Sequence, residues 1–296
     1  MMPTPSHSSF LKSPPSWLCE LPKKDPWSRP FAESLLSHLD LYEGATILDV
    51  ACGDGIPAFH LAHRVGPSGR VVGIDLNHAQ LVRSCAVQGP YFPWLEFRHG
   101  DVRMLPSDLG QFDRITGNLS FMFFRPQRQE ALQQLVHFLK PSGQLVLTFP
   151  SLGTFDSLWK RVDREMVQQG LTKERERFTD YLAERPSAAD ARQWLEACGL
   201  EKIDVAEYPL EVHTGPGDEF LFHPLLRGGF LDDVYECFTD QTLADQFMQT
   251  ISLDVQTFVP LVAQRCVMSA WRAGISPPST EHLGVAGFRA QVKAEQ

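Results

Sequence analysis

The stretch "ILDVACGDGIPAFHLA", residues 47–62, decides the fold. It opens with a short apolar run of the kind that forms a buried strand of a parallel sheet. It closes in a helical pattern, and Pro57 suits the first turn of a helix. Between the two, the segment from Gly53 to Ala58 fits G-x-G-x-x-[GA], the loop that holds the pyrophosphate of a dinucleotide. The stretch therefore predicts a strand, a ligand-binding loop and a helix in succession.

Strand and helix patterns alternate around this stretch, up to about residue 150. A helix is expected within residues 27–44, and later helices in "HAQLVRSCAV" and "RPQRQEALQQLVHFLK", the last closed by a turn at residues 141–143. Further buried strands are predicted in "GRVVGIDL", "WLEFRHGD", "FDRITGNLS" and "QLVLTFP". "EKIDVAEYPL" and "QRCVMSAWRA" are two later strand candidates. This alternation predicts an α/β fold with a Rossmann-like, doubly wound parallel sheet.

The domain organisation follows from where the alternation stops. We expect one domain over residues 25–275, with a helical cap built from two insertions at residues 151–186 and 210–264. Residues 1–24 are rich in Pro and Ser and are expected to be disordered or loosely draped. The tail at residues 276–296 has little apolar periodicity and is expected to lie outside the core.

Composition narrows the functional class. The net charge of −9 argues against nucleic-acid binding, which usually needs a basic stripe. The six cysteines lack the spacing of a zinc site or a disulfide framework, which favours free thiols in a reducing compartment. His60 and His63 have no ligand partner in register, so they do not indicate a metal. With no apolar leader and no run of membrane-spanning length, we expect a cytoplasmic protein without a metal.

Four polar residues mark the edge of the sheet where a ligand is expected, at the carboxyl ends of the strands. Asp49 comes just ahead of the glycines, and Asp75, Asp101 and Asn118 end the second, third and fourth strands. Asp75 suits ribose hydroxyls and Asp101 an adenine amino group, but dehydrogenases share both features. Asp49 distinguishes between a dinucleotide and other ligands, because a carboxylate at this position raises the cost of binding pyrophosphate. It suits a phosphate-free ligand with a cationic amino-acid end, such as S-adenosylmethionine.

A second test concerns the catalytic pair of short-chain dehydrogenases, a Tyr followed four residues later by a Lys. The positions four residues after the five tyrosines hold Thr46, Leu95, Arg185, Val212 and Thr239. That subclass is therefore excluded, while other dehydrogenases remain open.

Five motifs carry a family resemblance: "LDVACGDG", "VVGIDL", "GDV", "FDRITGNLSF" and "FLKPSGQLVLTFP". In this order they resemble the class I S-adenosylmethionine-dependent methyltransferases, in particular the small-molecule group that includes ubiquinone/menaquinone-biosynthesis methyltransferases. The resemblance spans roughly residues 45–150 and implies S-adenosylmethionine as the cofactor. It also implies a seven-stranded sheet, with the strand around residues 202–209 as the sixth and that around residues 265–271 as the antiparallel seventh.

The resemblance implies a role for each motif residue. Asp49 and Gly53 would lie by the methionine end of the cofactor, and Asp75 would hold the ribose. Asp101 would take the adenine amino group, with Val102 donating its backbone N–H to the ring. Asn118 would line the floor near the reacting methyl group, and Cys52 is interpreted as a small packing residue. The implied cofactor-binding set is Asp49, Ala51, Cys52, Gly53, Asp54, Gly55, Asp75, Leu76, Asp101, Val102 and Asn118.

The acceptor is expected to be a small molecule, apolar or aromatic. Residues 118–121, "NLSF", depart from the Asn/Asp-Pro-Pro-aromatic signature of amino-methylating DNA enzymes. Large side chains favour an apolar pocket; they are Phe121, Met122, Phe123, Phe124, Phe155, Trp159, Phe220 and Phe222. His213 and His223 are candidates for a general base, but the sequence identifies neither the catalytic residue nor the oligomeric state.

Two alternatives from other classes stay open. One is an NAD-dependent oxidoreductase. The other is a non-catalytic partner protein with the methyltransferase fold, whose usual mark is a damaged cofactor loop. The intact glycines and acidic residues of this chain count against the second alternative.

Overall fold

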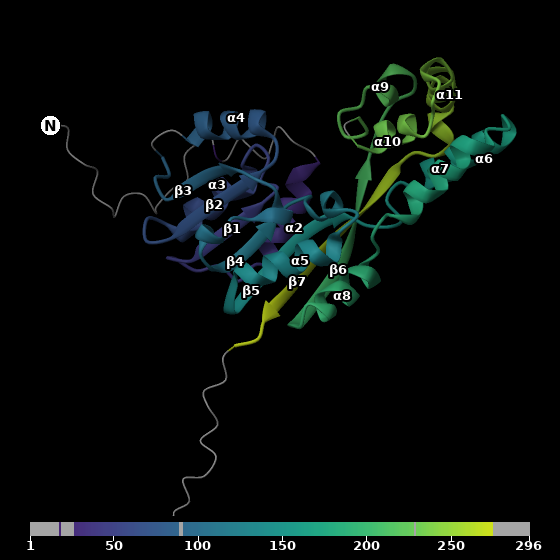
Figure 1. Ribbon diagram of the computed structural model, residues 1–296. Coiled ribbons are helices and arrows are strands. Elements are labelled where there is room, and N and C mark those ends of the chain that lie inside the picture. Colours follow the sequence, from purple (N-terminus) through teal and green to yellow (C-terminus); the bar gives the residue numbers. More distant parts are fainter. Residues whose placement is uncertain (1–17, 19–26, 89–90, 228, 275–296) are drawn as a thin grey trace, which may run out of the picture.

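The computed structural model describes residue 18 and residues 27–88, 91–227 and 229–274 (Figure 1). The expectations for residues 276–296, and for residues 1–24 apart from residue 18, lie outside these described residues.

Seven strands form a single sheet in the order β3-β2-β1-β4-β5-β7-β6. β7 is antiparallel to both β5 and β6, and the pairs among β1 to β5 are parallel. The strands are β1 Thr46–Val50, β2 Arg70–Asp75, β3 Leu95–His99, β4 Phe112–Gly117, β5 Leu139–Pro150, β6 Leu200–Val212 and β7 Leu261–Arg272. The predicted Rossmann-like sheet with an antiparallel last strand is confirmed. Its strand order reverses between β1 and β4, which is where such sheets bind ligands.

Helices cover both faces of the sheet because successive strand residues point to opposite sides. Ile47 packs into a core with α2 and α3, while its neighbour Leu48 packs into a core with α5 and α8. The helices of this part are α2 Ser28–His38, α3 Ile56–Val65, α4 His78–Gln88, α5 Arg128–Phe138 and α8 Ala188–Ala197. Short 3₁₀ turns follow β3 and β4: η3 Val102–Met104, η4 Ser107–Leu109 and η5 Phe121–Phe124. β1 therefore contributes to two cores at once.

The connection between α5 and β5 differs from the sequence prediction of a closing turn. β5 begins directly after α5, and Phe112 pairs with Leu139 while Arg114 pairs with Gln144. Residues 140–143 thus stand opposite a single residue of β4 and form an irregular section of β5. Ser142 takes a positive φ of 60° there. A Pro-Ser-Gly sequence fits a bulge as well as a free turn, and strand pairing decides between them.

Five further helices form a lobe with a hydrophobic core of its own. They are α6 Asp156–Gln168, α7 Thr172–Ala183, α9 Asp218–Leu221, α10 Phe230–Glu236 and α11 Gln241–Leu253, and η6 Val255–Thr257 follows α11. Figure 1 shows this helical lobe beyond one end of the sheet, with the long strands β6 and β7 running into it. These strands extend to Val212 and from Leu261, so both intrude into the expected insertion at residues 210–264. Among the described residues, no helix is long and apolar enough to cross a membrane.

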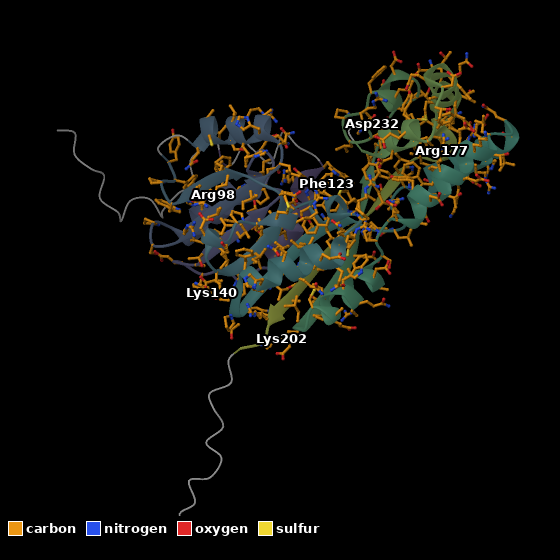
Figure 2. All side chains as sticks on the ribbon, in the orientation of Figure 1. Arg98, Phe123, Lys140, Arg177, Lys202 and Asp232 are labelled. Carbon is orange, nitrogen blue, oxygen red and sulfur yellow. The ribbon has the colours of Figure 1, made fainter. Side chains whose placement is uncertain are left out.

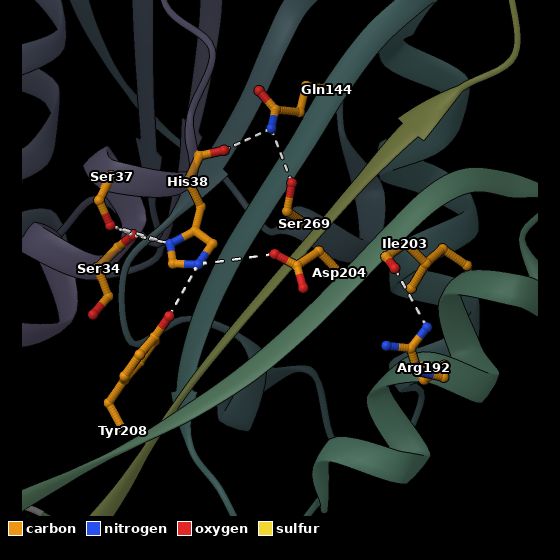
Figure 3. Close-up of polar contacts among 9 residues, drawn as sticks. All are labelled: Ser34, Ser37, His38, Gln144, Arg192, Ile203, Asp204, Tyr208 and Ser269. Atoms are coloured by element: carbon orange, nitrogen blue, oxygen red, sulfur yellow. Dashed lines mark hydrogen bonds and ion pairs between the residues drawn. The ribbon is translucent and has the colours of Figure 1, made fainter.

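A buried glutamine joins α2 to the centre of the sheet (Figure 3). Gln144 on β5 accepts a hydrogen bond from the backbone N–H of Asp40 at 2.8 Å. Its amide group donates to the carbonyl of His38 at 2.7 Å and to the hydroxyl of Ser269 on β7 at 2.9 Å. Around it, the His38 ring lies 3.4 Å from the Tyr208 hydroxyl of β6. One side chain thus satisfies the end of α2 and links it to two strands.

We predict that Gln144→Met destabilises the protein by roughly 2–4 kcal/mol, because the buried hydroxyl of Ser269 and the partly buried backbone groups of His38 and Asp40 lose a partner, at about 1–3 kcal/mol for a buried group. Methionine keeps the length of the side chain, so lost packing is a minor contribution. Urea unfolding measures the change, with Gln246→Met on the exposed face of α11 as the matched control. Equal stability of the two variants would contradict the structural role of Gln144.

Candidate functional site

The loop between β1 and α3 turns sharply at the carboxyl edge of the sheet. Ala51, Gly53 and Gly55 all have positive φ, at 50°, 53° and 77°. A Cβ at position 55 would lie 2.8 Å from Cζ of Phe97 and 3.0 Å from Cε2 of Phe59, so only glycine fits. Ala51 holds the same left-handed conformation with a Cβ, at a steric cost of about 1–2 kcal/mol. The loop is therefore a built feature rather than a loose connection.

Asp75 fastens this loop to the end of β2. One oxygen of its carboxylate accepts a hydrogen bond from the backbone N–H of Gly53, and the other from that of Asn77, both at 2.7 Å. The side chain of Asp75 thus sets the position of the glycine loop and of the start of α4. Its remaining lone pairs stay available to a ligand.

Asp49 is a fully buried carboxylate at the same edge. The hydroxyl of Thr116 on β4 donates to Oδ1 at 2.7 Å, but Oδ2 has no hydrogen-bond partner. Burial raises the pKa of Asp49 to about 7, the Thr116 hydrogen bond opposes the rise, and the nearby charge of Asp75 adds to it. A positively charged neighbour would stabilise this carboxylate.

Asn118 connects the end of β4 to the start of α2. Its amide donates to the carbonyl of Ser28 at 3.1 Å, and its oxygen accepts from the Thr148 hydroxyl at 2.8 Å. Beside it lies a cavity of about 150 Å³ lined by Ser28, Ala51, Cys52, Gly53, Asp54, Ile56, Pro57, Gln80 and Asn118. Five of the eleven expected cofactor residues therefore meet around one cavity, and Asp75 holds its loop.

The other expected residues lie around this cavity without lining it. Asp49 does not line it, so its charge would act on a ligand through space or through water in this conformation. Gly55 underlies the loop, and Leu76 is exposed beyond Asp75. Asp101 pairs with Arg103, whose Nη2 lies 2.6 Å from Oδ2, and these hydrogen bonds hold the pKa of Asp101 below its ordinary value. Val102 begins η3 and is packed against the sheet core.

Besides Ile56 and Pro57, which also line the cavity, sequence reasoning missed three contributors to the site. Ser28 and Gln80 line the cavity from α2 and α4, and Arg103 occupies the carboxylate of Asp101. Neither helix residue belongs to a motif, because its position depends on how the helix packs on the sheet. Arg103 comes two residues after Asp101. Many Asp and Arg residues at this spacing form no contact, so the sequence alone does not predict the ion pair.

A second cavity of about 410 Å³ lies between the carboxyl edge of the sheet and the helical lobe. Figure 2 labels a residue from each side, Phe123 of η5 and Asp232 of α10. Its lining residues are Met122, Phe123, Arg125, Arg128, Pro150, Tyr181, Glu184, Arg185, Pro186, Gly229, Phe230, Asp232, Asp233 and Glu236. The wall is thus partly apolar and strongly charged.

Most aromatic residues expected to line an acceptor pocket are core residues instead. Phe121 and Phe124 pack in the sheet core, whereas Phe155, Trp159 and Phe220 pack in the core of the lobe. Only Met122 and Phe123 of that set line the second cavity. The expectation was wrong for the buried rings because an aromatic-rich sequence looks the same whether it fills a core or a pocket.

Three side chains singled out in the sequence lie elsewhere. Phe222, His213 and His223 border a separate hollow at the tip of the lobe, so neither histidine faces the second cavity.

Burial raises the pKa of the Cys52 thiol, which makes it a poor nucleophile. Within residues 27–88, 91–227 and 229–274, no group of three or more His, Cys, Asp or Glu residues is arranged to hold a metal ion.

Residues 47–143 match the methyltransferase domain family. This is the segment that contains the glycine loop, Asp49, Asp75, Asp101 and Asn118. This match supports the resemblance of the segment to the class I S-adenosylmethionine-dependent methyltransferases.

Curated relatives agree with this assignment. The chain is 36% identical over 124 residues to nocamycin O-methyltransferase of Saccharothrix syringae, covering 41% of this chain and 44% of that one. It is 33% identical over 104 residues to demethylmenaquinone methyltransferase of Lactococcus lactis, covering 35% and 41%. The chain therefore spans less than half the length of these two relatives.

Solved structures share the fold of the methyltransferase domain. The BH2331 protein of Bacillus halodurans C-125 aligns with a TM-score of 0.52 and 20% identity, covering 82% of this chain and 98% of that one. The YcgJ protein of Bacillus subtilis aligns with a TM-score of 0.51 and 13% identity, covering 82% and 97%. At these identities the likeness concerns the fold alone.

We predict that Asp49→Asn stabilises the ligand-free methyltransferase domain at pH 8. The folded-state pKa of about 7 lies above the ordinary value of 3.8, so ionisation of Asp49 opposes folding. The penalty grows as the pH rises from about 4 to about 7 and then stays constant, on the order of 4 kcal/mol at most. Asparagine keeps an oxygen that can accept from Thr116 but carries no charge.

Urea unfolding at pH 5 and pH 8 measures this effect. The advantage of Asp49→Asn over the wild type should be larger at pH 8, whereas Asp108→Asn on the exposed η4 should show no such pH dependence. An advantage that is equal at the two pH values would contradict a raised pKa of Asp49.

Proposed function

We propose that the protein transfers a methyl group from S-adenosylmethionine to a small-molecule acceptor. One observation carries the proposal: apart from Ser28, the residues that line the cavity beside the glycine loop belong to the segment that matches the methyltransferase domain family. The relatives named above are methyltransferases, which supports the same class of activity.

The residues at the carboxyl edge fit this cofactor. The glycine loop would receive its amino-acid end, and Asp75 would accept from the ribose hydroxyls. The unpartnered oxygen of Asp49 suits an ammonium group and disfavours the pyrophosphate of a dinucleotide. Asp101, Val102 and Leu76 would surround the adenine, and Arg103 would share or release the carboxylate of Asp101 to admit the adenine amino group.

The second cavity is the proposed acceptor site. It borders η5, directly after β4, and Pro150 at the end of β5, so it opens at the edge where the cofactor would lie. Its volume of about 410 Å³ suits a small molecule, for which sites of about 300–1,000 Å³ are usual. The helical lobe would act as the cap that covers the acceptor.

The chemistry places modest demands on the protein. S-adenosylmethionine supplies an electrophilic methyl group on a sulfonium centre. The chain therefore needs mainly to orient the acceptor and to exclude water, for which a cavity between two rigid cores is well suited. The acidic charge of the chain favours a small molecule over nucleic acid as the acceptor.

Isothermal titration tests the proposed function against an NAD-dependent oxidoreductase. S-adenosylhomocysteine should bind the wild type with one site per chain, and NADH should give no saturable heat. Binding of NADH without binding of S-adenosylhomocysteine would overturn the proposal. Binding of neither would favour a non-catalytic role for the fold.

We predict that Asp75→Ala weakens the binding of S-adenosylhomocysteine by one to two orders of magnitude. Hydrogen bonds to a charged group contribute about 1.5–3 kcal/mol, and this variant also frees the glycine loop from β2. Circular dichroism should show an intact fold. Asp108→Ala removes an exposed carboxylate outside the site and serves as the control. Wild-type affinity of Asp75→Ala would show that the ribose lies elsewhere.

A further inference from the structure

Two arginines face the second cavity without a carboxylate partner. Arg128, at the start of α5, has an Nε atom that is buried and makes no hydrogen bond. Arg185, after α7, donates from Nη2 to the carbonyl of Thr154 at 2.9 Å. Within the described parts of the chain, neither guanidinium group lies within 4.0 Å of a carboxylate oxygen. Contacts other than ion pairs therefore hold both guanidinium groups at the cavity.

Tryptophan rings support both guanidinium groups from behind. Cζ of Arg185 lies 5.5 Å from the ring centroid of Trp159, and Cζ of Arg128 lies 5.8 Å from that of Trp194. Stacking on an indole fixes a guanidinium plane and leaves its N–H groups free to bind an anion. Burial lowers the pKa of both arginines, although the charges of Glu184 and Asp190 act against this at Arg128, and those of Asp156 and Asp233 at Arg185.

The other buried arginine of the lobe shows what compensation looks like. Arg161 of α6 lies 2.8 Å from Glu165 and 2.9 Å from Asp254, and these two partners raise its pKa despite burial. A buried charge without a partner costs free energy. Arg128 and Arg185 lack the carboxylate partners that Arg161 has.

Three of the four carboxylates that share the cavity lie beside arginines other than Arg128 and Arg185. Asp233 and Glu184 each lie 3.6 Å from Arg125, and Asp232 lies 3.3 Å from Arg227. Glu236 is the fourth carboxylate of the wall and is exposed. With Arg227 included, four guanidinium groups and four carboxylates balance at the cavity, so the positive charge is local to Arg128 and Arg185.

We propose that the acceptor carries a carboxylate, which Arg128 and Arg185 bind while Met122, Phe123 and Phe230 contact its apolar part. A guanidinium fork matches the planar geometry of a carboxylate. The identification of the bound molecule as the methyl acceptor rests on the proposed function. The preference of the cavity for an anion does not depend on it. The acceptor class is thereby an apolar carboxylic acid rather than a neutral quinone or lipid.

A matched pair of probes tests the proposal. 2-Naphthoate and 2-naphthamide have the same ring system and differ in the carboxylate, and their binding can be measured by titration with saturating S-adenosylhomocysteine. The wild type should bind 2-naphthoate at least tenfold more tightly than 2-naphthamide. Trp159 and Trp194 lie under the two arginines, so quenching of tryptophan fluorescence gives a second readout.

Variants assign the preference to the two arginines. Arg128→Gln and Arg185→Gln should each reduce the preference for 2-naphthoate about tenfold, and Arg128→Gln does not disturb the Thr154 contact made by Arg185. Arg192→Gln, on the exposed face of α8, removes the same charge outside the cavity and should leave the preference unchanged. Circular dichroism confirms folding of each variant.

The outcomes separate the two proposals. Equal affinity for the two probes in a wild type that binds S-adenosylhomocysteine would overturn the carboxylate assignment alone. A preference that survives both arginine variants would also overturn it, and so would tighter binding of 2-naphthyl phosphate. If S-adenosylhomocysteine does not bind, the proposed function fails, and the probes on the ligand-free protein still decide whether the cavity selects an anion.

Discussion

The hydrogen bond from Gly53 to Asp75 is the contact on which the site depends. It joins the loop after β1 to the end of β2 at 2.7 Å, and the second oxygen of Asp75 fixes Asn77 at the start of α4 in the same way. The backbone N–H of Cys52, which donates to the carbonyl of Ile74 at 3.1 Å, and the hydroxyl of Ser84, which donates to the carbonyl of Gly53 at 3.1 Å, hold the same loop. The site thus exists because two parallel strands end side by side and one carboxylate spans the gap between them.

The sheet could be predicted from sequence because parallel strands buried on both faces leave continuous apolar runs. Asp49, Asp75 and Asn118 could also be placed, since the carboxyl end of a strand has a fixed position in such a sheet. Ser28 and Gln80 could not, because their approach to the loop depends on helix packing that no local pattern encodes. The same limit applied to the aromatic residues: Phe155 and Trp159 fill a core, whereas Phe123 faces a cavity.

Charge shows the limit of sequence patterns even more clearly. Arg125, Arg128 and Arg185 look alike in the sequence, yet only Arg125 has carboxylate partners. The difference arises from α10, more than forty residues further along the chain, which brings Asp233 to one arginine and not to the others. Spacing along the chain carries no information about such pairing, so the charge pattern of the second cavity depends on how the lobe packs against the sheet.

The start of α2 links the two cavities physically. Ser28 lines the cavity beside the glycine loop and accepts a hydrogen bond from Asn118. The preceding residue, Trp27, packs its ring 5.7 Å from Phe230 and 6.1 Å from Phe155 of the lobe. Phe230 in turn lines the second cavity. A ligand that orders Trp27 and Ser28 at one cavity therefore also orders a wall of the other cavity. The second ligand then binds residues whose conformational entropy has already been lost. Binding of cofactor and acceptor is expected to be cooperative for this reason, without any displacement of the lobe.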